Sequence, residues 1–411
     1  MIKISRIKIP LAILLISAFI LSGCSEGRRA VPQALADKAE VPGMPGVRSN
    51  CDSTNPLMEK SLLESFKYEY PTYFPSDADG VKTYSSLAIS GGADNGAYGA
   101  GVLKGWSEAG SRPVFKVVTG VSTGALIAPY AFLGSEYDKE VETLFTNIST
   151  DDIVKRKGFL SGVFGNSLTS SEPLARLISA SVNDRLLSDI AREYGRGRRL
   201  FVGTVNLDAC KLIIWDMGAI AVLASRGNLQ ARELFKKVLL ASASIPVTFS
   251  PVLIDVEADG KMYKEMHVDG GTLSQVFFIY GLAHNLRKMA GKAGVDISKV
   301  KAKLYVIRNG KVTPGYKEMK SWLGAIAERS IDAMTGAQTV GDIYRLYAIS
   351  VEKGNDFNLA YIPDNYVSGK KEFFDKYEMR RLFERGYQDA LKGYSWHKTP
   401  PGWEKTLAGE E

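Results

Sequence analysis

The central part of the chain consists of short apolar runs that alternate with segments of helical periodicity. The runs are typical of buried strands, and they lie at about residues 85–90, 114–119, 199–206, 211–215, 251–256, 261–268 and 301–307. Where apolar residues recur every three to four positions, the pattern predicts helices near residues 96–109, 122–133, 171–194, 229–241, 276–291, 317–353 and 372–392. This alternation predicts a large α/β domain, a doubly wound and mostly parallel sheet with helices on both faces. The last two helices are extra C-terminal helices, which we expect to form a cap.

The N-terminus has the features of a cleaved export signal. The first eight residues carry three positive charges, and the apolar stretch at residues 10–21 is too short to be an ordinary membrane-spanning helix. The stretch ends at Leu21-Ser22-Gly23-Cys24, which resembles the lipobox of bacterial lipoproteins. The resemblance implies that residues 1–23 are removed as a signal peptide and that Cys24 becomes a lipidated N-terminus. An ordinary secretory signal that contains a cysteine is the alternative.

Composition divides the mature chain into three parts. Residues 24–55 mix Pro, Gly, Ala and charged residues without periodicity, which predicts a flexible tether between membrane and domain. Residues 56–395 form the predicted domain, and residues 396–411 are expected to be a loose tail. Ser25, directly after the cysteine, resembles the signal for transfer to the outer membrane. We therefore expect a lipid-anchored protein of the bacterial cell envelope, located at the outer membrane.

The net charge and the cysteine content indicate which ligands and partners the chain is expected to bind. The net charge is +7, and removal of the three cations of the leader leaves 7 − 3 = +4, which does not indicate nucleic-acid binding. The four arginines within residues 192–199 form either a solvated helix end or a contact for anionic lipid headgroups. Cys51 and Cys210 remain once Cys24 is lipidated, and their pairing is open. No Cys/His cluster has the spacing of metal ligands, so we expect no metal and no other cofactor.

A Gly-x-Ser-x-Gly turn lies between a predicted strand and the next predicted helix. It reads Gly120-Val121-Ser122-Thr123-Gly124. Such a turn lifts a serine hydroxyl off the end of a sheet, where it is exposed for attack on an acyl group. A side chain at Gly120 or Gly124 would collide across so sharp a bend. The pattern is weak on its own, so its value depends on its neighbours.

Two further glycine-rich turns lie on either side of the serine in sequence. Upstream, the strand at 85–90 ends at Gly91-Gly92-Ala93-Asp94-Asn95, and a helix follows. Backbone N–H groups at such a turn bind an anion, either a phosphate or the oxyanion of an attacked ester carbonyl. Downstream, the strand at 261–268 ends at Asp269-Gly270-Gly271, which places a carboxylate at a strand end. Asp-Gly is also a common hairpin signal, so Asp269 becomes a candidate only together with the serine turn.

In this order and setting, the three turns resemble those of the patatin-like phospholipases, over about residues 83–285. The segment Ala241-Ser242-Ala243-Ser244-Ile245-Pro246 is also similar to the part of that family between serine and aspartate. The resemblance implies an α/β lipid acyl hydrolase with a Ser–Asp dyad, in which Ser122 is the nucleophile and Asp269 the base. It further implies a nucleophile elbow at Gly120 and Gly124, an Asp-Gly-Gly turn at Gly270 and Gly271, and an oxyanion hole from Gly91, Gly92, Ala93, Asp94 and Asn95.

The chain departs from the family pattern at three places. A third glycine is usual where Ala93 stands, and a basic residue is usual where Asn95 stands. An Asn-Pro step is often found after the Asp-Gly-Gly turn, and here Thr272 and Leu273 take its place. We expect the absence of a cation at residue 95 to change the substrate preference and the rate more than the class of reaction.

Two other functions for these residues are a nucleotide site and a conventional Ser-Asp-His triad. Each requires a motif or a histidine position that the sequence does not provide. A nucleotide site needs Gly-x-Gly-x-x-Gly in register or a Gly-Lys-[Ser/Thr] step, and neither is present. A conventional triad would complete Ser122 and Asp269 with His284 or His397, but His284 falls in a helical run and His397 in the polar tail. His267 shares a strand face with Asp269 and is expected to be a packing or surface residue.

The sequence therefore predicts a membrane-anchored serine acyl hydrolase. It would cleave carboxylic esters of phospholipids or lysophospholipids through an acyl-enzyme, with membrane phospholipid or another acyl ester as its substrate. The alternative is an envelope lipoprotein that keeps the fold and binds lipid or a protein partner without turnover. The changed loop at Ala93 and Asn95 favours that alternative.

Overall fold

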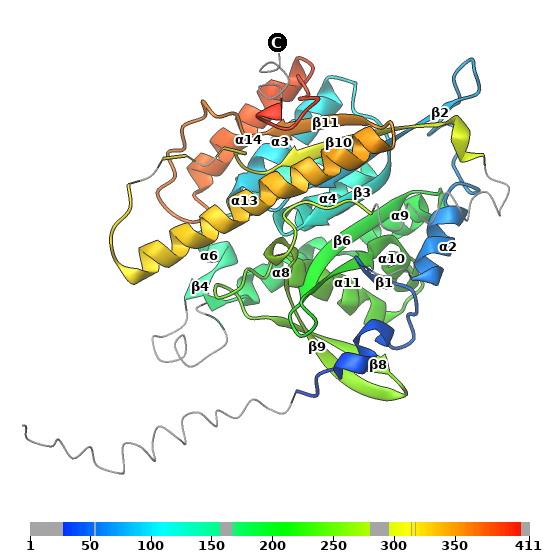
Figure 1. Cartoon of the computed structure of the whole chain (residues 1–411), viewed down its shortest axis with the longest axis horizontal. Coiled ribbons are helices and arrows are strands. Elements are labelled where there is room, and N and C mark those ends of the chain that lie inside the picture. The colour runs from blue at the N-terminus through cyan, green and yellow to red at the C-terminus, as the bar shows by residue number, and fades with distance from the viewer. Residues whose placement is uncertain are drawn as a thin grey trace, which may run out of the picture.

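The strands of the chain join into one central mixed sheet. The computed structural model describes residues 28–403 except 53–54, 157–166, 168, 280–295, 314 and 317. Within this part, the main path of the sheet is β1-β7-β6-β3-β2-β10-β11, and β9 joins it along β6 with β8 beyond (Figure 1). The strands are β1 (Arg48–Asn50), β2 (Lys82–Ile89), β3 (Phe115–Val121), β6 (Arg199–Asn206), β7 (Lys211–Asp216), β8 (Val252–Ala258), β9 (Lys261–Asp269), β10 (Val300–Arg308) and β11 (Asp356–Tyr361). A separate small pair is formed by β4 (Lys155–Arg156) and β5 (Thr169–Ser170).

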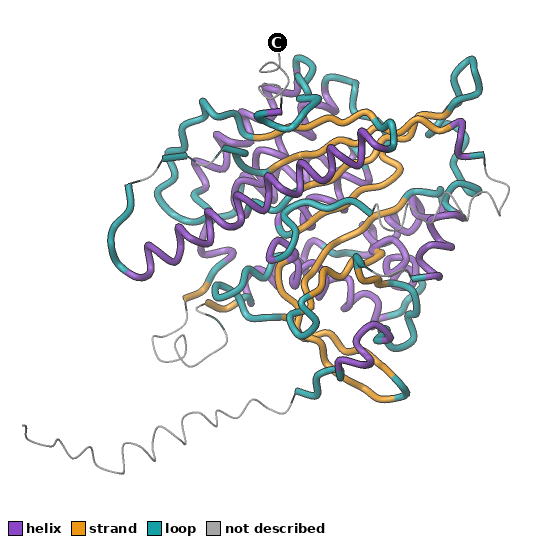
Figure 2. The backbone as a smooth tube through the Cα atoms, viewed as in Figure 1, coloured by secondary structure: helices purple, strands orange, loops and turns teal. Residues whose placement is uncertain are grey.

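The predicted fold class is confirmed. Strands β6, β3, β2, β10 and β11 are parallel neighbours, whereas β7, β1, β9 and β8 pair antiparallel. Helices cover both faces of the sheet, as the backbone view shows (Figure 2). They are α2 (Pro56–Glu64), α3 (Gly96–Glu108), α4 (Thr123–Leu133), α5 (Asp138–Thr146), α6 (Thr150–Ile153), α8 (Glu172–Ser181), α9 (Asp184–Gly195), α10 (Met217–Ser225), α11 (Leu229–Ser242), α13 (Leu323–Glu352) and α14 (Lys376–Leu391). No helix of the described residues is both long and apolar enough to cross a bilayer.

Successive residues of a strand point to opposite faces of the sheet, so a separate set of side chains is buried on each face. Leu87 and Ile89 of β2 pack with α3, α4, α9, α10, α11 and α14 in the larger core. Ala88, between them, faces α13 on the other side, where Ile343 and Leu346 cover β10 and β11. Every residue of β3 is buried, as expected of a central strand covered on both faces.

Several predicted elements differ in detail. The helix predicted at 171–194 is two helices, because the side chain of Asn183 accepts a hydrogen bond from the N–H of Leu186 and begins α9 there. The helix predicted at 276–291 falls mostly outside the described residues, and its first residues, 276–279, are not helical. The edge strands β1 and β11 and the helices α2 and α10 were not predicted.

The N-terminal segment is part of the fold, which corrects the expected flexible tether over its described residues, 28–52. Val41, Met44 and Val47 are buried in the larger core, and β1 pairs with β7. Arg48 forms a bidentate ion pair with Glu265 of β9, at 2.6 and 3.2 Å, and both side chains are almost completely buried. Only residues 24–27 and 53–54 of the predicted tether lie outside the described residues. Cys51 and Cys210 are both free.

The described C-terminal elements also pack on the domain instead of forming a cap or a loose tail. Met379, Leu382 and Phe383 of α14 are buried in the larger core, and Tyr394 hydrogen-bonds Tyr98 of α3 at 2.8 Å. The ring of Trp396 lies 4.7 Å from that of Trp106 and 4.9 Å from that of Tyr305. The tail is therefore ordered through residue 403, and residues 404–411 lie outside the described part.

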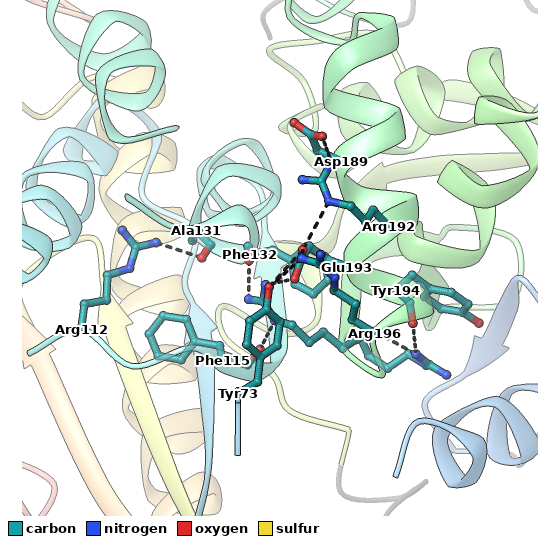
Figure 3. A network of polar contacts seen from close by, with 12 residues as sticks. Tyr73, Arg112, Phe115, Ala131, Phe132, Asp189, Arg192, Glu193, Tyr194 and Arg196 are labelled. Atoms are coloured by element: carbon teal, nitrogen blue, oxygen red, sulfur yellow. Dashed lines mark hydrogen bonds and ion pairs between the residues drawn. The ribbon is translucent and has the colours of Figure 1, made fainter. Parts of the chain in front are cut away.

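Arg198 and Arg199 belong to a buried network at the amino end of the parallel strands, and this corrects the expectation of a solvated segment or a lipid contact for these two residues. Arg192 and Arg196, at the end of α9, keep 51% and 33% of their side chains exposed, as a solvated helix end does. Glu193 accepts from Arg196 at 2.8 Å and from Arg198 at 2.9 Å, and Tyr73 donates to it at 3.3 Å (Figure 3). Arg198 also donates to the carbonyls of Phe115 and Phe132, at the start of β3 and near the end of α4. Only Arg192 keeps half of its side chain exposed.

Removal of Arg48 should destabilise the whole domain. Arg48→Ala leaves Glu265 buried without its cation, so we expect the free energy of unfolding to fall by about 3–5 kcal/mol. Arg28→Ala is the matched control, because its ion pair with Asp208 is at the surface and is expected to contribute about 1 kcal/mol or less. Urea unfolding of both variants measures the difference. Equal losses would contradict a structural role for β1, and a chain truncated to start at residue 56 should fold poorly for the same reason.

Candidate active site

The register of the sheet brings Ser122 and Asp269 together. Strand β6 pairs with β3 up to Val121↔Gly203 and with β9 from Thr204↔Asp269. Strand β9 therefore continues along the edge of β6 at the point where β3 ends. Ser122 follows the last residue of β3, so its side chain meets the last residue of β9.

Ser122 occupies a strained turn. Its φ of 55° and ψ of −126° lie outside the regions that ordinary residues favour, as in a nucleophile elbow. The elbow needs two glycines for space: a Cβ on Gly120 would lie 2.3 Å from the carbonyl oxygen of Gly124, and one on Gly124 would lie 2.3 Å from that of Ile89. The N–H of Ser122 donates to Ser242 Oγ at 3.0 Å, and Ser242 Oγ donates to the carbonyl of Gly203 at 2.7 Å. Ser242 thus fixes the elbow to the end of the β6–β3 pairing.

Asp269 accepts two hydrogen bonds on its carboxylate. Ser122 Oγ donates to Oδ2 at 2.6 Å, and the N–H of Gly271 donates to Oδ1 at 2.7 Å. Both residues are buried, Ser122 at 7% exposure and Asp269 at 5%. Burial raises the pKa of Asp269 to about 7, although the two hydrogen bonds act in the opposite direction. A base with a pKa near 7 is far better matched to a serine hydroxyl than an ordinary aspartate.

The glycine-rich loop contributes fewer amides than predicted. The N–H of Gly91 donates to the carbonyl of Gln275, and that of Asn95 donates to the carbonyl of Gly92. Within the described part of the chain, the N–H groups of Gly92, Ala93 and Asp94 have no recorded acceptor. Ala93 has a left-handed backbone with φ of 50°, and its carbonyl accepts from Thr123 Oγ1 at 2.7 Å. The three amides are therefore the ones that remain for an oxyanion.

The described histidines do not contact the Ser122–Asp269 pair. His397 bridges Leu359 of β11, which places it four strand spacings, roughly 19 Å, from Thr119 of β3. His284 lies outside the described residues. His267 is fully buried behind the site, and both of its ring nitrogens are hydrogen-bonded, to Thr204 and to Glu265.

The tautomer of His267 follows from its neighbours. The carboxylate of Glu265, which is paired with Arg48, can only accept, so His267 Nε2 carries the proton and donates to it at 3.0 Å. In the neutral ring Nδ1 is then an acceptor, and Thr204 Oγ1 donates to it at 2.9 Å while accepting from Trp215 Nε1 at 2.8 Å. Burial lowers the pKa of His267, in keeping with a neutral ring. His267 is therefore a packing residue that links Arg48 and Glu265 to β6.

A narrow apolar cavity opens beside Ser122. It encloses about 820 Å³ of space between atoms, open solvent at its mouth included. Ser122 and Ala93 line it next to the elbow, and the rest of the lining is almost entirely apolar side chains of α4, α5, α8 and α11 and of the segments that flank these helices, with Phe374. They include Leu126, Tyr130, Phe145, Ile148, Leu174, Ile178, Leu239 and Phe249.

Three residues near the site were not singled out in the sequence. Asn309 holds the glycine-rich loop, because its Nδ2 donates to the carbonyl of Ser90 at 2.8 Å and its Oδ1 accepts from the N–H of Gly99 at 3.2 Å. Lys370 forms an ion pair with the buried Asp94 at 2.6 Å. Arg308 donates to the carbonyl of Gly91 at 3.0 Å. The polar Arg308-Asn309-Gly310 step directly after a predicted parallel strand was the available signal, whereas nothing near Lys370 points to the loop.

Solved structures give weak likenesses. VipD from Legionella pneumophila is 12% identical, with 78% of this chain and 70% of VipD covered and a TM-score of 0.35. The type III effector protein ExoU is 14% identical, with 82% of this chain covered and a TM-score of 0.18, and the chain spans only 60% of ExoU. At these TM-scores neither likeness supports a conclusion. No curated protein matches the sequence significantly.

The sequence itself matches one family. Residues 87–280 match the family model of the patatin-like phospholipases, and this range contains the glycine-rich loop, the serine elbow and the Asp-Gly-Gly turn in the order seen in the structure. The chain therefore carries a patatin-like phospholipase domain over residues 87–280.

Proposed function

We propose that Ser122 and Asp269 form a catalytic dyad that hydrolyses the carboxylic esters of phospholipids or lysophospholipids. The observation that carries this proposal is the 2.6 Å hydrogen bond from Ser122 Oγ to a buried Asp269 carboxylate. Ser122 also lines an apolar cavity, which supplies a place for an acyl chain beside the nucleophile.

The reaction would proceed through an acyl-enzyme. Ser122 Oγ attacks the ester carbonyl carbon while its proton passes to Asp269, and the N–H groups of Gly92, Ala93 and Asp94 stabilise the oxyanion. The carbonyl reforms as the ester bond breaks, and the protonated Asp269 donates its proton to the leaving alcohol oxygen. A water molecule then gives a proton to Asp269 and attacks the acyl-enzyme. The fatty acid leaves, and the proton returns from Asp269 to Ser122.

We also propose that the mature protein is held at the cell envelope through Cys24, most simply at the outer membrane. The support is the charged start, the short apolar stretch and the Leu-Ser-Gly-Cys sequence, which all lie outside the described residues. The described fold begins at residue 28, so the anchor and the domain are separated by very few residues. The domain would therefore lie close to the membrane surface that holds its substrate.

Ser122→Ala should abolish ester hydrolysis without loss of stability, since a small elbow hydroxyl contributes little to the core. A fluorophosphonate probe should label the wild-type protein at Ser122 and should not label the variant. Ser225→Ala is a control, because Ser225 is an exposed residue at the end of α10 with only a local hydrogen bond. Absence of labelling and of turnover in the wild-type protein would favour the alternative, a lipoprotein that binds without catalysis.

The activity should depend on a group that titrates near pH 7. Asp269 must be ionised to accept the serine proton, so kcat/KM on a short-chain ester should fall about tenfold per pH unit below its pKa and level off above it. Asp269→Asn should be inactive. A midpoint near pH 4 would contradict the buried environment of Asp269.

The same pKa shift predicts a change in stability. Because folding raises the pKa of Asp269 from 3.8 to about 7, the free energy of unfolding should fall as the pH rises from about 4 to 7 and level off above 7. Asp269→Asn should therefore raise the free energy of unfolding at pH 8 by roughly 2–4 kcal/mol, with little difference near pH 4. Urea unfolding at the two pH values measures this effect, and equal stability of both proteins at pH 8 would contradict it.

Cys24→Ser should release the protein from membranes, because two or more acyl chains on one residue make a stable anchor. Its hydrolysis of a water-soluble ester should be unchanged, since the residues proposed for the chemistry all lie within residues 92–269. Hydrolysis of phospholipid in vesicles should fall, because the anchor supplies a high local concentration at the surface. Membrane fractionation and the two assays test this, and a variant that stays with the membrane fraction would refute the anchor.

A further inference from the structure

Two cationic side chains contact the glycine-rich loop. One forms an ion pair with a carboxylate, and the other does not. Lys370 Nζ lies 2.6 Å from the carboxylate of Asp94, so its charge is neutralised locally. Arg308, the last residue of β10, donates from Nη1 to the carbonyl of Gly91 at 3.0 Å and to Ser90 Oγ at 3.3 Å. Among the described residues, no carboxylate oxygen lies within 4.0 Å of its guanidinium.

Arg308 also keeps an unused donor. Its Nε is buried and has no hydrogen-bond partner within the described part of the chain. Asp342 acts on the guanidinium electrostatically, but its Oδ2 accepts from the N–H of Gln275 at 2.7 Å and from Ser274 Oγ at 3.2 Å. Burial lowers the pKa of Arg308 to about 10, which still leaves the group charged at neutral pH. A buried cation without a matched anion is costly, so a site of this kind is completed by an anionic ligand.

The unmatched guanidinium lies one residue away from the nucleophile. A Cβ built on Gly91 would be 3.2 Å from Ser122 Cβ, and the carbonyl of the same Gly91 accepts from Arg308. Gly91 is therefore a common neighbour of Ser122 and Arg308. In a glycerophospholipid, a single glycerol unit likewise joins the ester to the phosphate.

We propose that Arg308 binds the phosphate of the substrate and so makes the site selective for phospholipids over neutral acyl esters. A guanidinium binds phosphate oxygens through charge-assisted hydrogen bonds, and within the described part of the chain the N–H groups of Arg308 Nη2 make no other hydrogen bond. The proposal rests on the proposed hydrolase function and names the class of substrate that the same site selects.

The competing explanation is that Arg308 only braces the glycine-rich loop through the carbonyl of Gly91. A brace acts on every ester alike, whereas a phosphate site acts only on substrates that carry phosphate. The sharpest pair of substrates is 1-oleoyl-lysophosphatidylcholine and 1-oleoylglycerol in the same detergent micelles, because they share the acyl chain and the glycerol. The full-length protein is used throughout.

Arg308→Gln should lower kcat/KM for the lysophospholipid about 10- to 100-fold, mainly through KM, without a comparable change for 1-oleoylglycerol. Arg308→Lys should recover part of the loss. Lys370→Gln is the matched control: its loss would disturb Asp94 and the loop, so both substrates should change by the same factor. Equal loss on both substrates in Arg308→Gln, or a wild-type protein without preference for the lysophospholipid, would overturn the phosphate site.

A second variant leaves Arg308 in place. A Cβ on Gly310 would lie 2.9 Å from Arg308 Nη2 and 3.0 Å from Cζ, so Gly310→Ala must displace the guanidinium. It should lower selectivity in the same direction as Arg308→Gln, and unchanged selectivity would count against the proposal. Ser122→Ala separates the two levels of inference. If Ser122→Ala keeps turnover of both substrates, the proposed hydrolase mechanism fails. If it abolishes both while Arg308→Gln affects both equally, only the phosphate site fails.

Discussion

The site depends on one feature of the sheet. Along β6, the pairing with β3 ends at Gly203 and the pairing with β9 begins at Thr204. The Val121↔Gly203 and Thr204↔Asp269 pairs are adjacent rungs, so the end of one strand faces the end of another. Ser242 ties Ser122 to Gly203, and the carbonyl of Ser244 accepts from the N–H of Asp269. A shift of β9 by one residue would turn Asp269 to the opposite face of the sheet. The hydrogen bond between Ser122 and Asp269 is therefore a property of the sheet, and no loop has to place it.

The polar interior behind β9 keeps this register in place. Arg48, Glu265, His267 and Thr204 form a continuous hydrogen-bonded set that joins β1, β9 and β6. Every member is partnered, which a buried polar network requires to be stable. Removing one member leaves a buried charge or donor, so the network favours one pairing of the strands over its alternatives. The N-terminal segment thus acts on the site at a distance, through the strand that carries Asp269.

The sequence was sufficient for elements whose signal is local. Apolar runs and glycine turns predicted β2, β3 and β9 together with the turns that follow them, because strand composition and tight bends depend on neighbouring residues. It failed at residues 28–52, where Pro-Gly steps separate Val41, Met44 and Val47 and indicate neither helix nor strand, and where the partner of Arg48 is 217 residues away. It also could not show which loop amides are already used, since the N–H of Gly91 is taken by Gln275. Such contacts depend on how distant segments pack, and no local pattern encodes them.

The site has two chemically different sides, and they come from different parts of the chain. The apolar cavity is built largely from α4, α5, α8 and α11, inside the range that matches the family, as are Ser122 and Asp269. Arg308, Lys370 and Phe374 lie beyond residue 280, outside that range. An amphipathic substrate has the same division, with an acyl chain on one side of its ester and a charged headgroup on the other. We therefore propose that the matched domain supplies the chemistry and the acyl site, and that the C-terminal strands and loops of this chain contribute to the choice of headgroup.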